Sequence, residues 1–126
     1  MMAKILVVDD SGMSRRALRK ILEPAGHQIT EAEDGIAALE HYYLDKPDLV
    51  LLDLTMTGMY GTEVLEKLRE MDLQARVIVA SADIQSSTRA LVEKAGASDI
   101  INKPFVVSQV LGAVSKALQG DTDGTV

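Results

Sequence analysis

Residues 47–56 read PDLVLLDLTM, a run of aliphatic residues that ends on the carboxylate of Asp53. The unbroken apolar run from Leu49 to Leu52 is typical of a strand that is buried on both faces, as in the centre of a parallel sheet. Asp53 stands where this strand ends, which is where ligands bind in open α/β sheets. The acid is therefore either a loop cap or a reactive group, and the rest of the chain must decide between them.

Four further segments resemble this strand, and a helical pattern follows each strand of the series. The predicted strands are 5–8, 27–33, 49–52, 77–80 and 100–102. The apolar residues that follow each one recur at spacings of three and four, which predicts amphipathic helices. Alternating strands and helices predict a doubly wound α/β fold with a five-stranded parallel sheet and helices on both faces. Because 27–33 is the most polar strand, we expect it at an edge, in the flavodoxin-like order 2-1-3-4-5.

The composition of the 126 residues limits the classes of protein to which the chain can belong. The length predicts one domain, 1–118, followed by a short polar tail, 119–126. Cysteine is absent, which excludes disulfides and cysteine-based zinc sites. A net charge of −6 without a basic cluster argues against direct nucleic-acid binding. The apolar runs are too short for a membrane span or a signal peptide, so a cytoplasmic location is expected.

Polar residues follow the predicted strands at the points where parallel strands would end together. These residues are Asp9, Asp10, Asp53, Ser81 and Lys103. Carboxylates that are brought together repel one another unless a cation lies between them. Mg²⁺ (or Mn²⁺) suits such a site, because it prefers oxygen ligands and keeps several waters, so that two carboxylates and a backbone carbonyl suffice.

An ammonium and a hydroxyl beside such an ion are suited to a phosphoryl group, whose oxygens need positive charge and hydrogen-bond donors. Lys103 would neutralise one phosphoryl oxygen, and Ser81 would donate to another. Asp53 is then the candidate nucleophile, which would carry the phosphoryl group as an acyl phosphate. Alone, an acidic pair is most often a helix cap and a serine a loop residue, so it is the combination that favours a site.

These motifs follow one another in the order of a known family. An acidic pair follows the first strand, an aspartate the third, a serine the fourth, and the tripeptide Lys-Pro-Phe, 103–105, the fifth. With these motifs the chain resembles the receiver domain of response regulators, of the chemotaxis-regulator type, over about residues 4–118. The resemblance implies a phosphorylation switch in which a histidine kinase or phosphotransfer protein supplies a phosphohistidine. The receiver itself would catalyse transfer to Asp53 with Mg²⁺ present and later dephosphorylation, without being a turnover enzyme.

The resemblance also implies which residues bind the metal ion. Asp10 and Asp53 would bind it together with the backbone carbonyl of Thr55, and Asp9 would act mostly through water. Thr55 and Asp83 occupy the two positions by which this family tunes the attack of water on the acyl phosphate. Arg15, Arg16 and Arg19 give the first predicted helix a basic surface.

The switch itself is also implied by resemblance. Ser81 would follow the phosphoryl oxygen, Lys103 would pair with it, and the peptide bond before Pro104 would be cis. Ile100 stands where the family often has an aromatic residue, so an aromatic gate is not expected, and movement of the fourth helix would carry the signal. The fourth helix, fifth strand and fifth helix would contact an unknown downstream protein. Residues expected to be exposed on this face are Arg89, Lys94, Gln109 and Lys116.

Three alternatives to a stand-alone switch are compatible with parts of this pattern. The chain could be the receiver part of a larger response regulator, or a pseudo-receiver that binds partners without phosphorylation. A pseudo-receiver usually lacks an acid or the lysine, and this chain has both. A phosphatase with an aspartyl-phosphate would typically carry a second acid two residues after the nucleophile, where this chain has Thr55.

Overall fold

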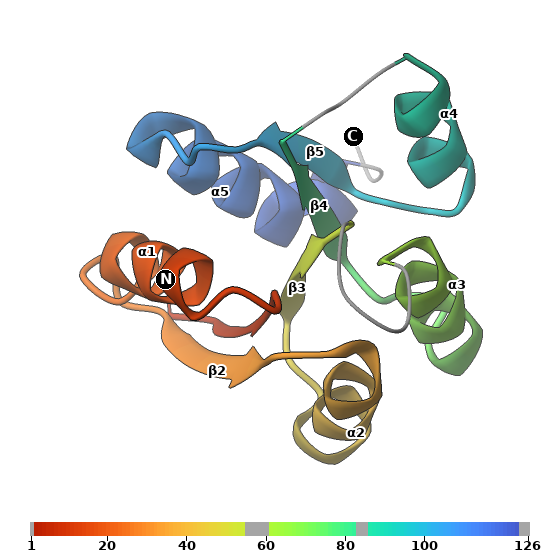
Figure 1. The fold of residues 1–126 in the computed structure, drawn as a ribbon, viewed down its shortest axis with the longest axis horizontal. Helices are drawn as coiled ribbons and strands as arrows, with labels where there is room; N and C mark the ends of the chain where they lie inside the picture. Colours follow the sequence, from red (N-terminus) through yellow and green to blue (C-terminus); the bar gives the residue numbers. More distant parts are fainter. Residues whose placement is uncertain (1, 55–60, 83–85, 124–126) are drawn as a thin grey trace.

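The computed structural model describes residues 2–54, 61–82 and 86–123, which form a parallel sheet covered by helices on both faces (Figure 1). The strands are β1 (Lys4–Val8), β2 (Gln28–Ala32), β3 (Leu49–Asp53), β4 (Val77–Ser81) and β5 (Asp99–Asn102). The helices are α1 (Gly12–Leu22), α2 (Gly35–Asp45), α3 (Gly61–Met71), α4 (Ser86–Lys94) and α5 (Val107–Asp123). The strand order is β2-β1-β3-β4-β5, with every pairing parallel, which confirms the predicted fold.

Different helices cover the two faces of the sheet, because successive residues of a strand point to opposite sides. Ile5 and Val7 of β1 pack with α1 and α5, whereas Leu6 and Val8 pack with α2, α3 and α4. Figure 1 shows these two groups of helices on the left and right of the sheet. All residues of β3 are buried, and each fully buried aliphatic side chain contributes about 1.5–3 kcal/mol. The predicted central strand is therefore the middle of the core.

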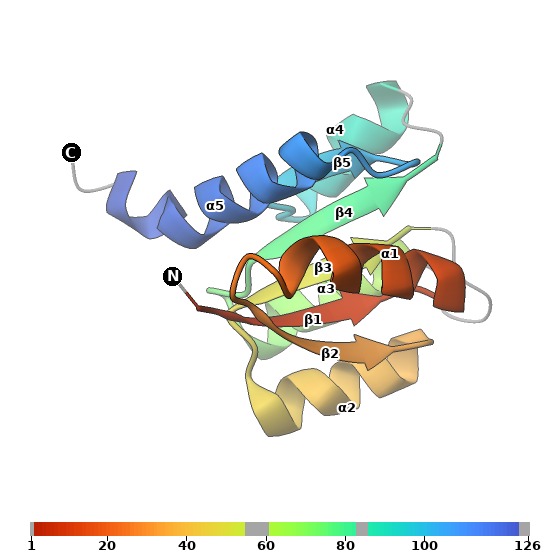
Figure 2. The ribbon, with the colours of Figure 1, turned by 90° about the vertical axis from the view of Figure 1, so that its left-hand side faces the viewer.

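The carboxyl ends of all strands lie on one side of the molecule, as the arrowheads in Figure 2 show. Side-chain caps fix the starts of two helices near this edge. Ser11 Oγ accepts a hydrogen bond from the Ser14 N–H at the start of α1, and Asp34 Oδ1 accepts one from the Ala37 N–H at the start of α2. Caps of this kind stabilise a helix by about 1 kcal/mol. The caps therefore fix where α1 and α2 begin after their strands.

The C-terminal part of the chain differs from the prediction, which placed a polar tail after residue 118. Helix α5 continues to Asp123, because no proline interrupts residues 119–123. The glycine at position 120 disfavours the helix by about 1 kcal/mol but does not stop it. Among the residues that the structure describes, no helix combines the length and the apolar character needed to cross a membrane.

His27 joins the start of β2 to the segment before β1, and this contact predicts a pH dependence of stability. Its Nδ1 accepts a hydrogen bond from the Ala3 N–H at 3.2 Å, which requires a neutral ring. Burial lowers the pKa of His27 below its ordinary value of 6.5. The unfolded chain therefore binds this proton more readily, so the stabilisation is complete above pH 6.5 and is lost as the pH falls through the lowered pKa.

Urea unfolding measures this effect at pH 7.5 and pH 5.5, each about one unit from the ordinary pKa of histidine. We expect the loss of unfolding free energy at the lower pH to be smaller in His27→Gln than in the wild type. The matched control is His41→Gln, since His41 lies on the surface of α2 and pairs only loosely with Asp45, at 3.4 Å. Equal losses in all three proteins would show that the contact of His27 with Ala3 does not control the response.

Candidate functional site

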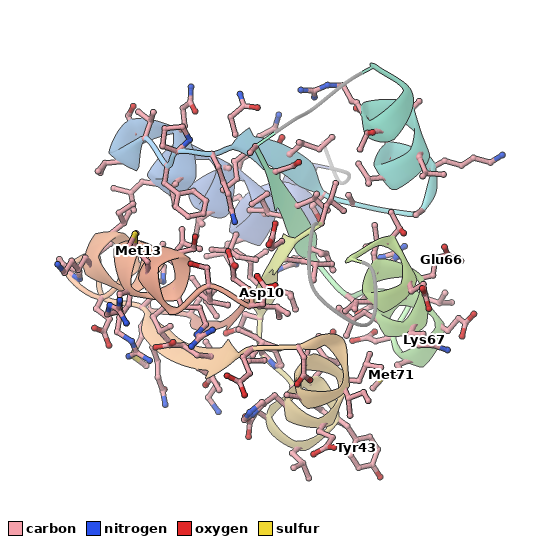
Figure 3. All side chains as sticks on the ribbon, viewed as in Figure 1. Asp10, Met13, Tyr43, Glu66, Lys67 and Met71 are labelled. Carbon is pink, nitrogen blue, oxygen red and sulfur yellow. The ribbon has the colours of Figure 1, made fainter. Side chains whose placement is uncertain are left out.

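The polar residues predicted from the strand ends gather at the carboxyl edge of the sheet. Asp9 follows β1 directly, Asp53 is the last residue of β3, and Ser81 is the last residue of β4. These three side chains are buried, with 2–4% of each residue exposed. Asp10 is exposed, and Figure 3 shows it over the end of the sheet, between α1 and α3 in that view. Buried carboxylates on adjacent strands are costly unless charged partners or an ion compensate them.

Lys103 supplies positive charge to this cluster. Its Nζ donates to Asp9 Oδ2 at 2.8 Å and lies 3.5 Å from Asp53 Oδ1. The backbone places it there, because the Lys103 N–H donates to the Ser81 carbonyl at 3.0 Å and so extends the pairing of β4 with β5. Burial acts to lower the pKa of Lys103, but the hydrogen bond to Asp9 and the charges of Asp53 and Asp9 outweigh it and raise the pKa. Lys103 therefore carries a firmly held charge at neutral pH.

Asp9 is bonded at each of its polar atoms. Its Oδ1 accepts from the Ser11 N–H at 2.9 Å, and its Oδ2 accepts from Lys103. Its N–H donates to the Ala32 carbonyl at 3.1 Å, and its own carbonyl accepts from Arg15 Nη1 at 2.7 Å. An acid that is held in this way has little freedom to turn toward a new ligand.

The acidic cluster fits a hard divalent cation. One carboxylate oxygen from each of Asp9, Asp10 and Asp53 can be chosen so that all lie within 4.8 Å of one another. Oxygen donors at this density match Mg²⁺, which needs few protein ligands and retains water in its other positions. The donor set therefore agrees with the predicted metal ion.

The structure brings together the residues that the sequence analysis placed at the strand ends, while their roles remain proposals. Ile100 is half-buried and packs against the core shared with α2, α3 and α4. The peptide bond between Lys103 and Pro104 is cis, as predicted. Thr55 and Asp83 lie outside the described residues. The residues predicted to be exposed on α4 and α5 are exposed: Arg89, Lys94, Gln109 and Lys116.

Two arginines of the predicted basic surface pair with an acid on β2 beside the site, and this pairing was not predicted. Arg15 Nε donates to Glu31 Oε1 at 2.8 Å, and Arg19 binds Glu31 Oε2 at 2.7–2.8 Å. The arginine hydrogen bonds, that of Arg15 first, lower the pKa of Glu31. Arg15 and Arg19 lie four residues apart on one helix face, and this spacing opposite an acid on β2 was the available signal. The predicted basic surface of α1 is therefore partly neutralised.

The fold and the site together define a class: single α/β domains that carry acids and a lysine at the carboxyl edge of a parallel sheet. Residues 5–115 match the response regulator receiver domain family. The chain therefore belongs to this family, which confirms the resemblance seen in its motifs.

Individual relatives agree with this assignment. The chain is 41% identical over 116 residues to the chemotaxis protein CheY of Bacillus subtilis, and the match covers 91% of this chain and 97% of CheY. It is 35% identical to sporulation initiation phosphotransferase F of the same organism, over 91% of this chain and 93% of that protein. A CheY-like receiver domain structure from Methanospirillum hungatei superposes with a TM-score of 0.91, covering 98% and 99% of the two chains. At 24% identity, that last match supports the fold alone.

Proposed function

We propose that this receiver domain is a phosphorylation-dependent signalling switch of a two-component phosphorelay and that Asp53 accepts the phosphoryl group. The observation that carries the proposal is the position of the Asp53 carboxylate at the buried end of β3, 3.5 Å from Lys103 Nζ and beside two further acids. A nucleophile, a fixed cation and a cluster of metal-binding oxygens are the parts that phosphoryl transfer to a carboxylate needs.

Asp10 and Asp53 would hold Mg²⁺ (or Mn²⁺), with the backbone carbonyl of Thr55 as a third ligand and Asp9 acting through water. When bound, the ion supplies positive charge that offsets both the repulsion among the carboxylates and the charge on the phosphoryl oxygens. The exposed side chain of Asp10 leaves the cluster open to solvent, from which the ion would enter.

In the proposed reaction, a carboxylate oxygen of Asp53 attacks the phosphorus of a phosphohistidine on a histidine kinase or phosphotransfer protein. The new P–O bond replaces the P–N bond, and the leaving imidazole retains the electron pair and takes up a proton. Lys103 would then exchange part of its contact with Asp9 for a phosphoryl oxygen, and Ser81, buried at the end of β4, would donate its hydroxyl to another. Hydrolysis of the acyl phosphate would reset the switch, at a rate tuned by Thr55 and Asp83.

We propose that the signal leaves through the face formed by α4, β5 and α5, which would bind a downstream protein in the cytoplasm. A hollow of about 270 Å³ on this face is lined by residues of β5 and α5, including Gln109 and Lys116. Ile100 of β5 packs against the core that α4 also covers. A movement of Ser81 and α4 would therefore displace Ile100, and no aromatic gate is needed.

The test is phosphorylation by a small donor, followed by mass measurement of the intact protein. Acetyl phosphate with Mg²⁺ should add the mass of one phosphoryl group, and the addition should disappear when the metal is chelated. Borohydride reduction of the acyl phosphate and peptide mapping should then locate the modification at Asp53. A pseudo-receiver would gain no mass under any of these conditions, and modification at another residue would also contradict the proposal.

A second measurement tests the metal ligands by thermal unfolding. Mg²⁺ should raise the melting temperature of the wild type, because a ligand that binds only the folded state stabilises it. We expect Asp10→Ala to abolish this increase, while its melting temperature without metal is the same or higher, since one of three crowded carboxylates is gone. Glu66→Ala is the matched control, because Glu66 is an exposed acid on α3 and its removal changes the net charge equally (Figure 3). A full Mg²⁺ response in Asp10→Ala would remove Asp10 from the ligand set.

A further inference from the structure

Arg15 makes a contact with the acidic pair that its neighbour Arg19 does not make. Its guanidinium spans two elements: Nε donates to Glu31 Oε1 on β2 at 2.8 Å, and Nη1 donates to the backbone carbonyl of Asp9 at 2.7 Å. Arg19 instead binds the other oxygen of Glu31 and also Glu23, the residue that caps the end of α1. The Arg15 side chain is only 18% exposed, so these bonds are partly shielded from water. Arg15 is therefore tied to the site, and Arg19 to the helix surface.

The carbonyl that Arg15 binds belongs to the peptide unit between Asp9 and Asp10. Because that unit is planar, fixing its oxygen also fixes the direction in which the chain enters Asp10. The Ser11 N–H bond to Asp9 Oδ1 holds the other side of the same turn. Asp10 is exposed, and the direction of the backbone at this turn sets where its side chain begins.

The charges around Arg15 are balanced. Arg15 and Arg19 carry two positive charges, and Glu31 and Glu23 carry two negative charges in the same network. A bare arginine beside a cation site would repel the cation, whereas a paired arginine can supply a rigid hydrogen bond with little net charge. The guanidinium suits this function, because one planar group makes both hydrogen bonds, to Glu31 and to the Asp9 carbonyl, in fixed relative directions.

We infer that Arg15, anchored by Glu31, is a positioning residue that holds the peptide between Asp9 and Asp10 so that Asp10 faces the metal ion. This inference rests on the proposed function, since it concerns the metal-binding acids of that site. It makes Arg15 an outer support of the metal centre, and removal of such supports typically lowers metal affinity by about 10-fold or more.

The sign of the effect separates this role from a purely electrostatic one. Removing a positive charge near three carboxylates would, by itself, strengthen the binding of a cation. Loss of a positioning contact would weaken it. Calorimetric titration of the unphosphorylated protein with Mg²⁺ measures the affinity directly, without a phosphodonor.

We expect the dissociation constant for Mg²⁺ to increase about 10-fold in Arg15→Ala. Arg19→Ala is the matched control, since it removes the same charge and a bond to the same glutamate, and it should bind Mg²⁺ at least as tightly as the wild type. Arg15→Lys should also bind more weakly, although it keeps the charge, because an ammonium cannot reproduce the fixed fork. In the metal-free protein, the Ser11 amide should exchange with solvent faster in Arg15→Ala than in Arg19→Ala.

Unchanged or tighter Mg²⁺ binding in Arg15→Ala would overturn the inference. If Arg15→Ala does not fold, the lysine variant decides, and wild-type affinity in it would overturn the inference equally. Equal weakening by Arg15→Ala and Arg19→Ala would assign the effect to Glu31 alone and would also overturn it. If the wild type binds Mg²⁺ but gains no phosphoryl group, the proposed function is contradicted. The Mg²⁺ affinities of the variants would still test whether Arg15 positions Asp10.

Discussion

The Asp53→Asn variant is expected to gain no phosphoryl group from acetyl phosphate and Mg²⁺, whereas the wild type gains one. An amide oxygen is uncharged and its nitrogen lone pair is delocalised, so the side chain that ends β3 would no longer be a nucleophile. Asparagine has nearly the same volume as aspartate, so the tightly packed end of the strand is not disturbed. The variant loses the attraction to Lys103 at 3.5 Å, which lowers the stability of the fold. It also loses the repulsion from the neighbouring carboxylates, which raises the stability, so the two effects oppose each other.

The matched control for this variant lies at the opposite end of the same strand. Asp48 precedes β3 and its Oδ2 accepts a hydrogen bond from the Lys4 N–H at 2.8 Å, which an asparagine oxygen can also accept. Asp48→Asn should therefore be phosphorylated like the wild type. Intact-mass measurement and circular dichroism check both variants. Phosphoryl uptake by Asp53→Asn equal to that of the wild type would require a different acceptor.

The fold was predictable because its signals are local and repeated. The apolar run from Leu49 to Leu52 indicated a strand buried on both faces, and the polar residues 27–33 indicated an edge strand. The ends of the helices and strands were less predictable, because they depend on contacts as well as on composition. Helix α5 extends past residue 118 since no residue there breaks it, although the polar composition indicated a tail.

The residues of the site were predictable because parallel strands bring their carboxyl ends together without any specific contact. Asp9, Asp53, Ser81 and Lys103 needed only the strand order to become neighbours. The bonds among them were not predictable. That Lys103 binds Asp9 more closely than Asp53, at 2.8 Å and 3.5 Å, depends on the loop that follows β5.

The support provided by Arg15 was the least predictable feature. Its bond to the Asp9 carbonyl joins a side chain to a backbone group, and such bonds leave no pattern of residue types in a sequence. Arg15 and Arg19 can bind Glu31 only because this side chain lies on the face of β2 that α1 covers. A shift of one residue in the register of β2 would place Glu31 on the opposite face of the sheet. Charges on the surface of a helix are therefore weaker predictors than charges at strand ends.

The Gly61→Ala variant is expected to lose both stability and phosphorylation, because Gly61 has no room for a side chain. A Cβ at this position would lie 2.5 Å from Leu54 Cα and 2.6 Å from the carbonyl oxygen of Asp53. Both neighbours are backbone atoms, so no change of rotamer can relieve the overlap. The Gly61 N–H also donates to the Leu54 carbonyl at 3.1 Å, which ties the start of α3 to the end of β3. The methyl group must therefore displace either α3 or the backbone that carries Asp53.

Overpacking against backbone is expected to cost about 3 kcal/mol, which would lower the melting temperature by roughly 10 °C. Displacement of Asp53 by about 1 Å would slow phosphorylation by acetyl phosphate on the order of 100-fold. Gly112→Ala is the matched control, because nothing lies within 4 Å of the added Cβ on α5. It should be stabilised by about 0.5–1 kcal/mol through its helix propensity and phosphorylated normally. Wild-type melting and labelling in Gly61→Ala would show that the junction of β3 and α3 does not constrain Asp53, whereas the expected loss would show that the reactive end of the strand is held by backbone contact with α3.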